Sequence, residues 1–265
     1  MQRMPRPSPQ TDRVVAVLNL LGHDDAGLTA SDIARRVGAN RASCVHMLAA
    51  LEAAGFVARG AVDRRYRLGP ALVGLGAAAA RAFPGLETAR RELDELTRTT
   101  GYPSFAFTRE GEHARLLAFT WDLRRAAPAM RTGDTILLAP PLGSVFFAWT
   151  ASTDVDEWIA RGAGDAEALR DTLDAVRRLG FVVELLPEQL VEATTGGAQL
   201  DVRGFVAREV HDTERYQVSS LSVPVFAGDG RVALALNLAG FTGALTGREV
   251  HDLAAALQAA AARCG

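Results

Sequence analysis

Side chains that could bind a polyanion are concentrated between residues 28 and 68. Arg41, Ser43 and His46 follow Asn40 on the outward face of a predicted helix, whose other outward positions are small or aliphatic. A guanidinium group can bond to a phosphate or to the O6 and N7 atoms of guanine, and short polar side chains can reach base edges. We therefore interpret this face as one that can enter the major groove of double-stranded DNA.

Four further arginines surround a predicted turn at residues 60–63. Strand-like residues flank this turn, so the segment is predicted to be a β-hairpin. A hairpin with this many guanidinium groups can run along phosphates or enter the minor groove. The alternative is a solvated hairpin whose charge serves only solubility. The four arginines are Arg59, Arg64, Arg65 and Arg67.

Two predicted helices must position these groups. Thr29 is expected to cap the first helix, with Asp32 three residues later as a shortened capping box. Gly38 would end that helix, and Asn40 would cap the second. A third helix is expected over residues 11–21. The second helix has a predicted buried stripe of Cys44, Met47, Leu48 and Leu51, and with the basic hairpin the pattern is typical of a winged helix-turn-helix.

The charge distribution supports this interpretation, although ordinary pairs of helices can match a helix-turn-helix pattern by chance. Residues 1–83 hold 11 arginines and 6 acidic residues, a net charge of +5, whereas the whole chain has a net charge of −2. A basic head on an acidic body is expected where only the head contacts nucleic acid. We predict a DNA-binding domain with a linker helix over residues 1–83 and a second domain over residues 84–265.

The predicted linker helix follows Pro70, a residue that suits the first turn of a helix. Its surface is formed by small and aliphatic residues, which would allow close packing against a second copy. We interpret it as a dimer contact, and the alternative is a helix that packs on its own domain.

Beyond Tyr102 the pattern changes to strands early and late, with helices between them. One hairpin is expected around residues 110–112 and another around residues 227–230. An apolar helix is expected over residues 144–151, and further helices near residues 154–161, 165–179 and 247–263. This order predicts an α+β ligand-binding module of the GAF or PAS type.

Catalytic and metal-binding patterns are missing from the sequence. The five histidines and two cysteines have no metal-ligand spacing, and Ser144 lacks the second glycine of a nucleophile elbow. No apolar run approaches the roughly 20 residues that span a membrane, and the N-terminus lacks the apolar region of a secretory signal. We therefore expect no catalytic residue, no metal, no cofactor, no membrane association and a cytoplasmic location.

Residues 31–59, SDIARRVGANRASCVHMLAALEAAGFVAR, and residues 66–76, YRLGPALVGLG, resemble the IclR family of transcriptional regulators. The second half is similar more loosely, through GYPSFAFTREGE, VRRLGFVV and SVPVFAGDGRVALALNLAG. The resemblance implies a homodimer or homotetramer that binds palindromic operator DNA and senses a small molecule through its C-terminal domain. His46 departs from the family, which usually has an arginine there.

The resemblance also implies where an effector would bind. Pro141 and Leu142 would line the pocket by position, next to the predicted helix start at Gly143 and Ser144. Asn237 and Ala239 stand where the family often has serines, and an acidic pocket residue would fall near Glu214. We place the pocket between Gly143 and the strands around Phe107, Phe119 and Asn237. The missing N–H donors of Pro140 and Pro141 and the bulk of Leu142 favour an organic acid larger and more apolar than a two- or three-carbon acid, such as an aromatic acid. Other aromatic residues that could line it, or belong to the core, are Phe105, Trp121, Phe146, Phe147 and Trp149.

Two other functions remain as alternatives. The first is an enzyme built on a GAF-like domain and fused to a DNA-binding head, which would require a cluster of catalytic residues such as cysteines. The second is a constitutive DNA-binding protein with a purely structural body. Ligand-induced thermal stabilisation distinguishes a sensor from that second alternative, because a bound ligand stabilises the folded state.

Overall fold

A computed structural model describes residues 8–83, 85–122, 124, 129–162, 164–186 and 205–265. The contacts between residues group the chain into two compact units, Met1–Ala82 and Phe83–Gly265. Each unit has its own hydrophobic core.

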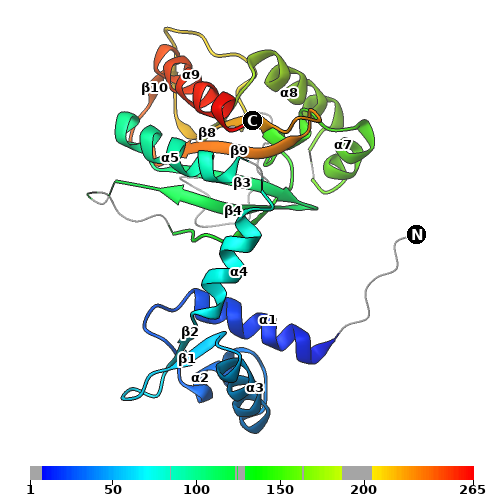
Figure 1. The fold of residues 1–265 in the computed structure, drawn as a ribbon. Helices are drawn as coiled ribbons and strands as arrows, with labels where there is room; N and C mark the ends of the chain where they lie inside the picture. Colours follow the sequence, from blue (N-terminus) through cyan, green and yellow to red (C-terminus); the bar gives the residue numbers. More distant parts are fainter. Residues whose placement is uncertain (1–7, 84, 123, 125–128, 163, 187–204) are drawn as a thin grey trace. The chain divides into compact units, whose positions relative to one another are not determined.

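The first unit is a winged helix-turn-helix, as the sequence predicts. Helices α1 (Pro9–Gly22), α2 (Ala30–Arg36) and α3 (Arg41–Ala53) precede the antiparallel pair β1 (Val57–Arg59) and β2 (Tyr66–Leu68), which forms the wing (Figure 1). The helices and the wing enclose a core that includes Val17, Leu21, Ile33, Cys44, Leu48, Val57 and Tyr66.

The helix boundaries in this unit are set by local hydrogen bonds. The Thr29 hydroxyl accepts the Asp32 N–H at 3.2 Å, which confirms Thr29 as the cap of α2, and it also donates to the Asp32 carboxylate at 2.7 Å. The Asn40 side chain accepts the Ser43 N–H at 2.8 Å and so caps α3. Between the two helices, Gly38 has a φ of 64°, in the region that favours glycine.

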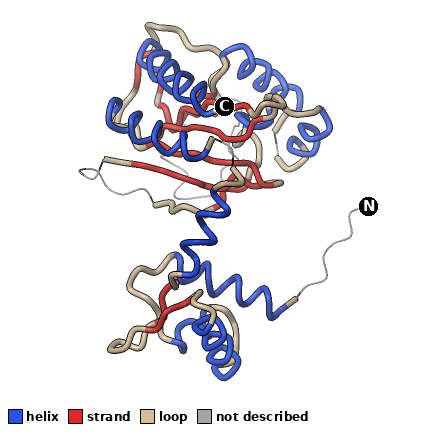
Figure 2. Tube along the Cα trace, viewed as in Figure 1, coloured by secondary structure: helices blue, strands red, loops and turns tan. Residues whose placement is uncertain are grey.

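Helix α4 (Ala71–Ala80) follows the wing and begins directly after Pro70, as predicted (Figure 2). None of its residues is buried within the chain. Val73 is 75% exposed and Leu75 is 53% exposed, so the helix presents aliphatic side chains to solvent.

The second unit is built on an antiparallel sheet of six strands in the order β5-β4-β3-β9-β8-β6. The hairpins β3–β4 and β8–β9 confirm the two that were predicted, and they pair through β3 and β9. The strands are β3 (Ser104–Glu110), β4 (His113–Thr120), β5 (Thr135–Leu137), β6 (Val182–Leu185), β8 (Val218–Phe226) and β9 (Val232–Ala239).

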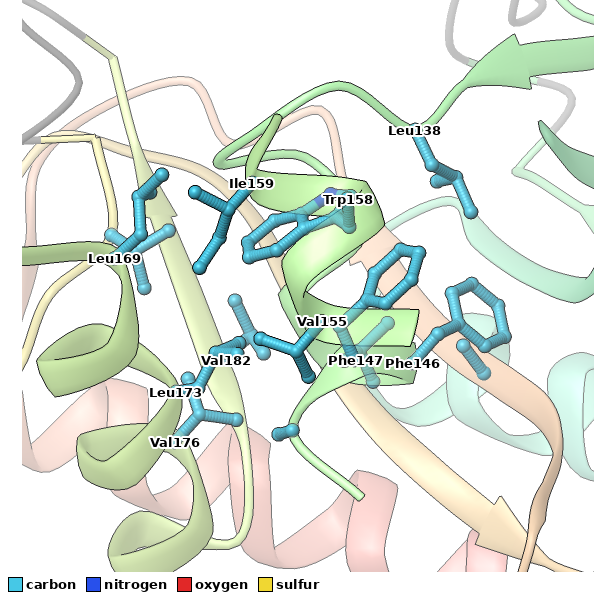
Figure 3. Packing of buried hydrophobic residues seen from close by; sticks show 14 of the residues in the cluster. Leu138, Phe146, Phe147, Val155, Trp158, Ile159, Leu169, Leu173, Val176 and Val182 are labelled. Carbon is cyan, nitrogen blue, oxygen red and sulfur yellow. The ribbon is translucent and has the colours of Figure 1, made fainter. Parts of the chain in front are cut away.

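Helices cover both faces of this sheet. Helices α5 (Leu86–Thr100) and α9 (Gly247–Cys264) pack on one face, and Figure 1 shows them on the same side of the strands. On the opposite face, α6 (Ser144–Phe147) rests on β8 and β9. Helices α7 (Ser152–Ile159) and α8 (Ala166–Leu179) complete a core with α6, in which the Phe147 and Trp158 rings stack at 4.9 Å (Figure 3). The predicted α+β class is confirmed.

Some elements differ from the prediction. The apolar helix expected over residues 144–151 stops at Phe147; residues 144–148 are all buried, so their hydrophobicity shows no helical period from which the end could be predicted. The edge strand β5 and a small sheet of β7 (Arg215–Tyr216) and β10 (Leu245–Thr246) were not predicted. Strands of two or three residues are too short to show alternation. Residues 187–204, between β6 and β7, lie outside the described residues.

Candidate nucleic-acid interface and ligand site

Helix α3 is held by one apolar stripe and presents its other face to solvent. Cys44, Leu48 and Leu51 are buried, whereas Arg41, Ser43 and His46 are all exposed. With about 100° of rotation per residue, Arg41 and Ser43 lie at the two edges of the exposed face. The residues between them include Ala42, Val45 and Ala49, which are also exposed. The structure therefore brings the three predicted contact residues to one surface that small side chains leave accessible.

A hollow of about 570 Å³ borders this surface between α1 and α3. Ser43 and His46 contribute to its rim, and Arg13 of α1 lies on the opposite side. Val14, Met47 and Phe56 form much of its apolar lining. Met47, which was predicted to be buried, is half-buried because it faces this hollow.

The four wing arginines lie in different environments. The Arg59 guanidinium lies 5.2 Å from the centroid of the Tyr66 ring. Arg65 donates to the carbonyl of Gly27 at 2.7 Å, and Arg67 donates at 2.7 Å to the carbonyl of Ala26 and to Asp63. Arg64 is exposed, and among the described residues its side chain has no hydrogen-bond or ion-pair partner. The sequence alone could not show which wing arginine has which environment, because the partners lie in other strands or loops.

The second candidate site is on the sheet face that carries α6. Strand register places Phe119, Phe105, Asn237, Ser222 and Val182 side by side across β4, β3, β9, β8 and β6. Val182 belongs to the core beneath α6 to α8, so this row lies on the α6 face. Asn237 donates to the Ser222 hydroxyl at 2.8 Å. The predicted residues Phe119 and Asn237 are therefore brought together, and Phe107 lies one row nearer α6.

Aromatic rings form a ladder along this face. The ring centroids of Phe107 and Phe105 are 6.2 Å apart, those of Phe105 and Phe119 6.1 Å, and those of Phe119 and Trp121 5.3 Å. Adjacent planes are within 24° of parallel. Phe146 and Phe147, by contrast, belong to the core and are buried. The ladder offers a flat wall against which a planar ring can stack.

A carboxyl group that the sequence analysis missed lies beside the polar row. Glu184 of β6 pairs with Ser220 of β8, whose hydroxyl donates to the Glu184 carboxyl at 2.5 Å. Burial raises the pKa of Glu184 above its ordinary value, and the hydrogen bond from Ser220 acts in the opposite direction. The sequence FVVELL could have indicated this residue, because Val182 and Glu184 are two positions apart in a strand and therefore share one face, which is buried.

The residues at the start of α6 form a tight, internally bonded turn. Gly143 has a φ of 93°, and a Cβ there would lie 2.9 Å from Leu138. The Ser144 hydroxyl donates to the Pro141 carbonyl at 2.7 Å, and Trp158 donates to the Leu142 carbonyl at 3.1 Å. These predicted residues lie on the α6 face, but the Ser144 hydroxyl and the Pro141 and Leu142 carbonyls already have partners in the turn or on α7.

Glu214, which the resemblance places near the pocket, lies apart from this group of residues. It is exposed in the turn before β7, where it accepts a hydrogen bond from the Tyr216 hydroxyl at 2.9 Å. Its carbonyl accepts the N–H of Gly247 at the start of α9, the helix on the opposite sheet face. The acidic residue on the α6 face is Glu184, from a different strand.

Among the described residues, no group of three or more histidine, cysteine, aspartate or glutamate side chains is arranged to hold a metal ion. Within the same residues, no helix has the length and apolar character needed to cross a membrane.

Comparisons with known proteins agree with this geometry. Residues 10–61 match the IclR helix-turn-helix domain. The chain is 25% identical to the HTH-type transcriptional regulator XynR of Escherichia coli (strain K12) over 252 residues, which cover 94% of this chain and 92% of XynR.

Solved structures show the same fold over almost the whole length. An IclR transcriptional regulator from Alicyclobacillus acidocaldarius has a TM-score of 0.68 at 23% identity, covering 98% of this chain and 100% of its own. An IclR homologue from Microbacterium hydrocarbonoxydans, solved as a complex with 4-hydroxybenzoate, has a TM-score of 0.70 at 20% identity, covering 96% of this chain and 97% of its own. Residues 10–61 are thus an IclR helix-turn-helix domain, and the chain as a whole shares its two-part fold with IclR transcriptional regulators.

Proposed function

We propose that this chain binds operator DNA through the exposed face of α3 and the wing, and that a small aromatic ligand in the second unit changes its affinity for that DNA. The observation that carries the proposal is the α3 surface, where Arg41, Ser43 and His46 are exposed next to small residues. Arg41 would read a guanine in the major groove, and Ser43 and His46 would contact groove edges.

The wing would supply the contacts that do not depend on base sequence. Arg64 is the wing arginine with no side-chain partner among the described residues, and Arg59 covers Tyr66 while remaining exposed. Guanidinium groups at such positions bind phosphates or enter the minor groove, and these contacts make affinity depend on salt. Arg65 and Arg67, by contrast, already have backbone carbonyl partners in the first unit.

The ligand proposal rests on the aromatic ladder and the polar row beside it. A planar ring could stack on Phe105 and Phe119, while Ser222 and Asn237 bond to a polar substituent. The Microbacterium hydrocarbonoxydans homologue in complex with 4-hydroxybenzoate supports an aromatic acid as the ligand class. The occupied polar groups of Pro141, Leu142 and Ser144 assign those residues to the support of the site rather than to ligand contact.

An oligomer fits the same proposal. Helix α4 exposes Val73 and Leu75 and has no buried residue, so its aliphatic surface would be covered by a second copy in a homodimer or in a homotetramer of two dimers. A two-fold pair of heads would bind two half-sites of a palindrome. Ligand binding would then act by linkage, because it favours one arrangement of the paired heads over another.

We favour a regulator without catalytic activity over the fused enzyme. Burial raises the pKa of Cys264 to about 11, so this thiol stays protonated near neutral pH and is a poor nucleophile. The Ser144 hydroxyl donates to a backbone carbonyl rather than to a base. Such a regulator would act in the cytoplasm, where operator DNA is located.

Ligand binding can be tested separately from DNA binding. Thermal unfolding of the full chain with a panel that includes 4-hydroxybenzoate, benzoate and pyruvate should show stabilisation by an aromatic acid, of about 2.7 kcal/mol at a hundredfold excess over Kd. Asn237→Ala should reduce that shift, whereas the exposed control Arg231→Ala should not. Stabilisation by pyruvate alone, unchanged in Asn237→Ala, would refute both the ligand class and the site.

A further inference from the structure

The turn of the wing is organised by one carboxylate. Asp63 accepts the backbone N–H of Arg65 at 3.0 Å through one oxygen and the Arg67 guanidinium at 2.7 Å through the other. The hydrogen bond from Arg67 lowers the pKa of Asp63, so this carboxyl is ionised at neutral pH. Backbone bonds from Gly60 to Arg65 at 2.9 Å and from Arg64 to Gly60 at 3.1 Å close the same turn.

The wing is also fastened to the loop between α1 and α2. Arg67 continues from Asp63 to the Ala26 carbonyl, and Arg65 reaches the Gly27 carbonyl, both at 2.7 Å. Leu28 and Tyr66 exchange two backbone bonds of 3.0 and 2.7 Å beside them. Gly27 has a φ of 76°, and a Cβ there would lie 2.8 Å from the Arg67 side chain. Only glycine therefore fits between this loop and Arg67.

Arg64 lies between two residues that are fixed in this way. Its φ is 55°, and it is the non-glycine residue with positive φ among the described residues. Arginine rarely adopts this conformation unless its surroundings impose it. Here Asp63, which precedes Arg64, bonds to the backbone of Arg65, which follows it, and also to the side chain of Arg67. Arg64, whose side chain has no partner among the described residues, thus lies within a hydrogen-bonded turn.

We propose that Asp63 and Arg67 are positioning residues that hold the wing so that Arg64 meets DNA, and that neither contacts DNA itself. This inference rests on the DNA binding proposed above. It separates the contact residue Arg64 from a supporting brace, defined as Asp63, Arg67 and the Ala26 carbonyl.

The direction in which one substitution changes DNA affinity distinguishes this positioning role from long-range electrostatic attraction. Asp63 adds a negative charge to a surface that approaches phosphates, so removing the charge should strengthen DNA binding if only long-range attraction matters. If Asp63 positions Arg64, its removal should weaken binding instead. Asp63→Asn is nearly isosteric and removes the charge that holds Arg67. Glu52→Gln is a matched control, because it removes an exposed carboxylate from α3 of the same unit.

Fluorescence anisotropy of the full chain on a labelled random-sequence duplex of about 30 base pairs, at about 50 to 200 mM salt, would measure both affinity and its salt slope. We expect Arg64→Ala to weaken binding about fivefold or more and to reduce the slope by about one. Asp63→Asn should weaken binding to a similar degree, and it should have almost no further effect in the Arg64→Ala background. Arg67→Lys keeps the charge but cannot bridge Asp63 and Ala26, so it should behave as Asp63→Asn does.

Binding by Asp63→Asn that equals or exceeds the wild-type affinity, as expected for Glu52→Gln, would overturn the proposal. The proposal would also be overturned if the losses of DNA affinity caused by Asp63→Asn and by Arg64→Ala multiplied in the double variant, because the two residues would then act independently. Failure of the wild-type chain to bind the duplex at the lowest salt would instead refute DNA binding itself.

A second measurement tests the brace without DNA. Trypsin cleaves after arginine when the backbone opens locally, so the rate of cleavage after Arg64 reports how firmly the wing turn is held. Asp63→Asn should raise this rate severalfold, and Glu52→Gln should leave it unchanged. An unchanged rate in Asp63→Asn would show that the carboxylate does not hold the turn.

Discussion

Substitution of Leu48 by alanine tests how the first unit holds its DNA-binding helix. Leu48 is on the inner face of α3 and has 0% of its surface exposed, within a core that includes Val17, Ile33 and Cys44. Removing three buried carbons costs about 2.4 kcal/mol of transfer free energy at roughly 0.8 kcal/mol each. The cavity adds to this, and measured losses for such substitutions are about 2 to 5 kcal/mol.

That loss is large for a unit of this size. A domain of about 80 residues loses about 4 to 8 °C in Tm for each kcal/mol, so the melting transition of the first unit should fall by more than about 10 °C. Calorimetry of the full chain should show this transition move while that of the second unit stays in place, because Leu48 lies in a separate core. The neighbouring substitution Val45→Ala is the matched control, since Val45 is 42% exposed.

The Leu48→Ala substitution should also affect DNA binding. Near the lowered transition temperature the variant should lose DNA binding in parallel with helix content, and it should recover both on cooling. A Tm shift no larger than that of Val45→Ala, or an equal shift of both transitions, would contradict the account of two cores.

Three further outcomes are expected. Arg41→Ala should weaken binding to a selected operator by about 1 to 3 kcal/mol and relax the preference at one base pair, which selection from randomised duplexes would reveal. The pKa of Glu184 is higher in the folded state than in the unfolded state. The protonated carboxyl therefore stabilises the fold fully below the unfolded pKa of about 4.3, and this stabilisation is lost as the pH rises through the folded pKa. Glu184→Gln should therefore gain Tm relative to the wild type between about pH 5 and 8, and a constant difference would argue against the burial of this carboxyl. Cys264, with its pKa raised to about 11, should react with a thiol reagent near pH 7.5 only after unfolding, and fast reaction of the native chain would contradict its burial.

The sequence predicted the elements of the first unit because their signals are local. The cap at Thr29 involves a residue three positions away, and the cap at Asn40 does the same. Apolar spacing along α3 separated the buried residues from Arg41 and His46 for the same reason, since both faces belong to one short helix. Such features are determined within a turn or two of chain.

Features that depend on distant partners were not predictable in the same way. Arg67 bonds to a carbonyl 41 positions away, and Ser220 bonds to Glu184 across 36 positions. Neither pair leaves a pattern in the sequence, because the partners come together only when the chain has folded. Glu214, which the resemblance places near the pocket, lies in an exposed turn, and its position in the sequence alone gave no sign of this.

The central claim is that α3 and the wing recognise a particular DNA sequence. Its most direct test is to select duplexes from a random pool with the full chain and compare the affinity for the selected duplex with that for a shuffled one at physiological salt. The account predicts a ratio of about a thousandfold or more for the wild type and a much smaller ratio for Arg41→Ala. Equal affinity for selected and shuffled duplexes, unchanged by Arg41→Ala, would contradict it.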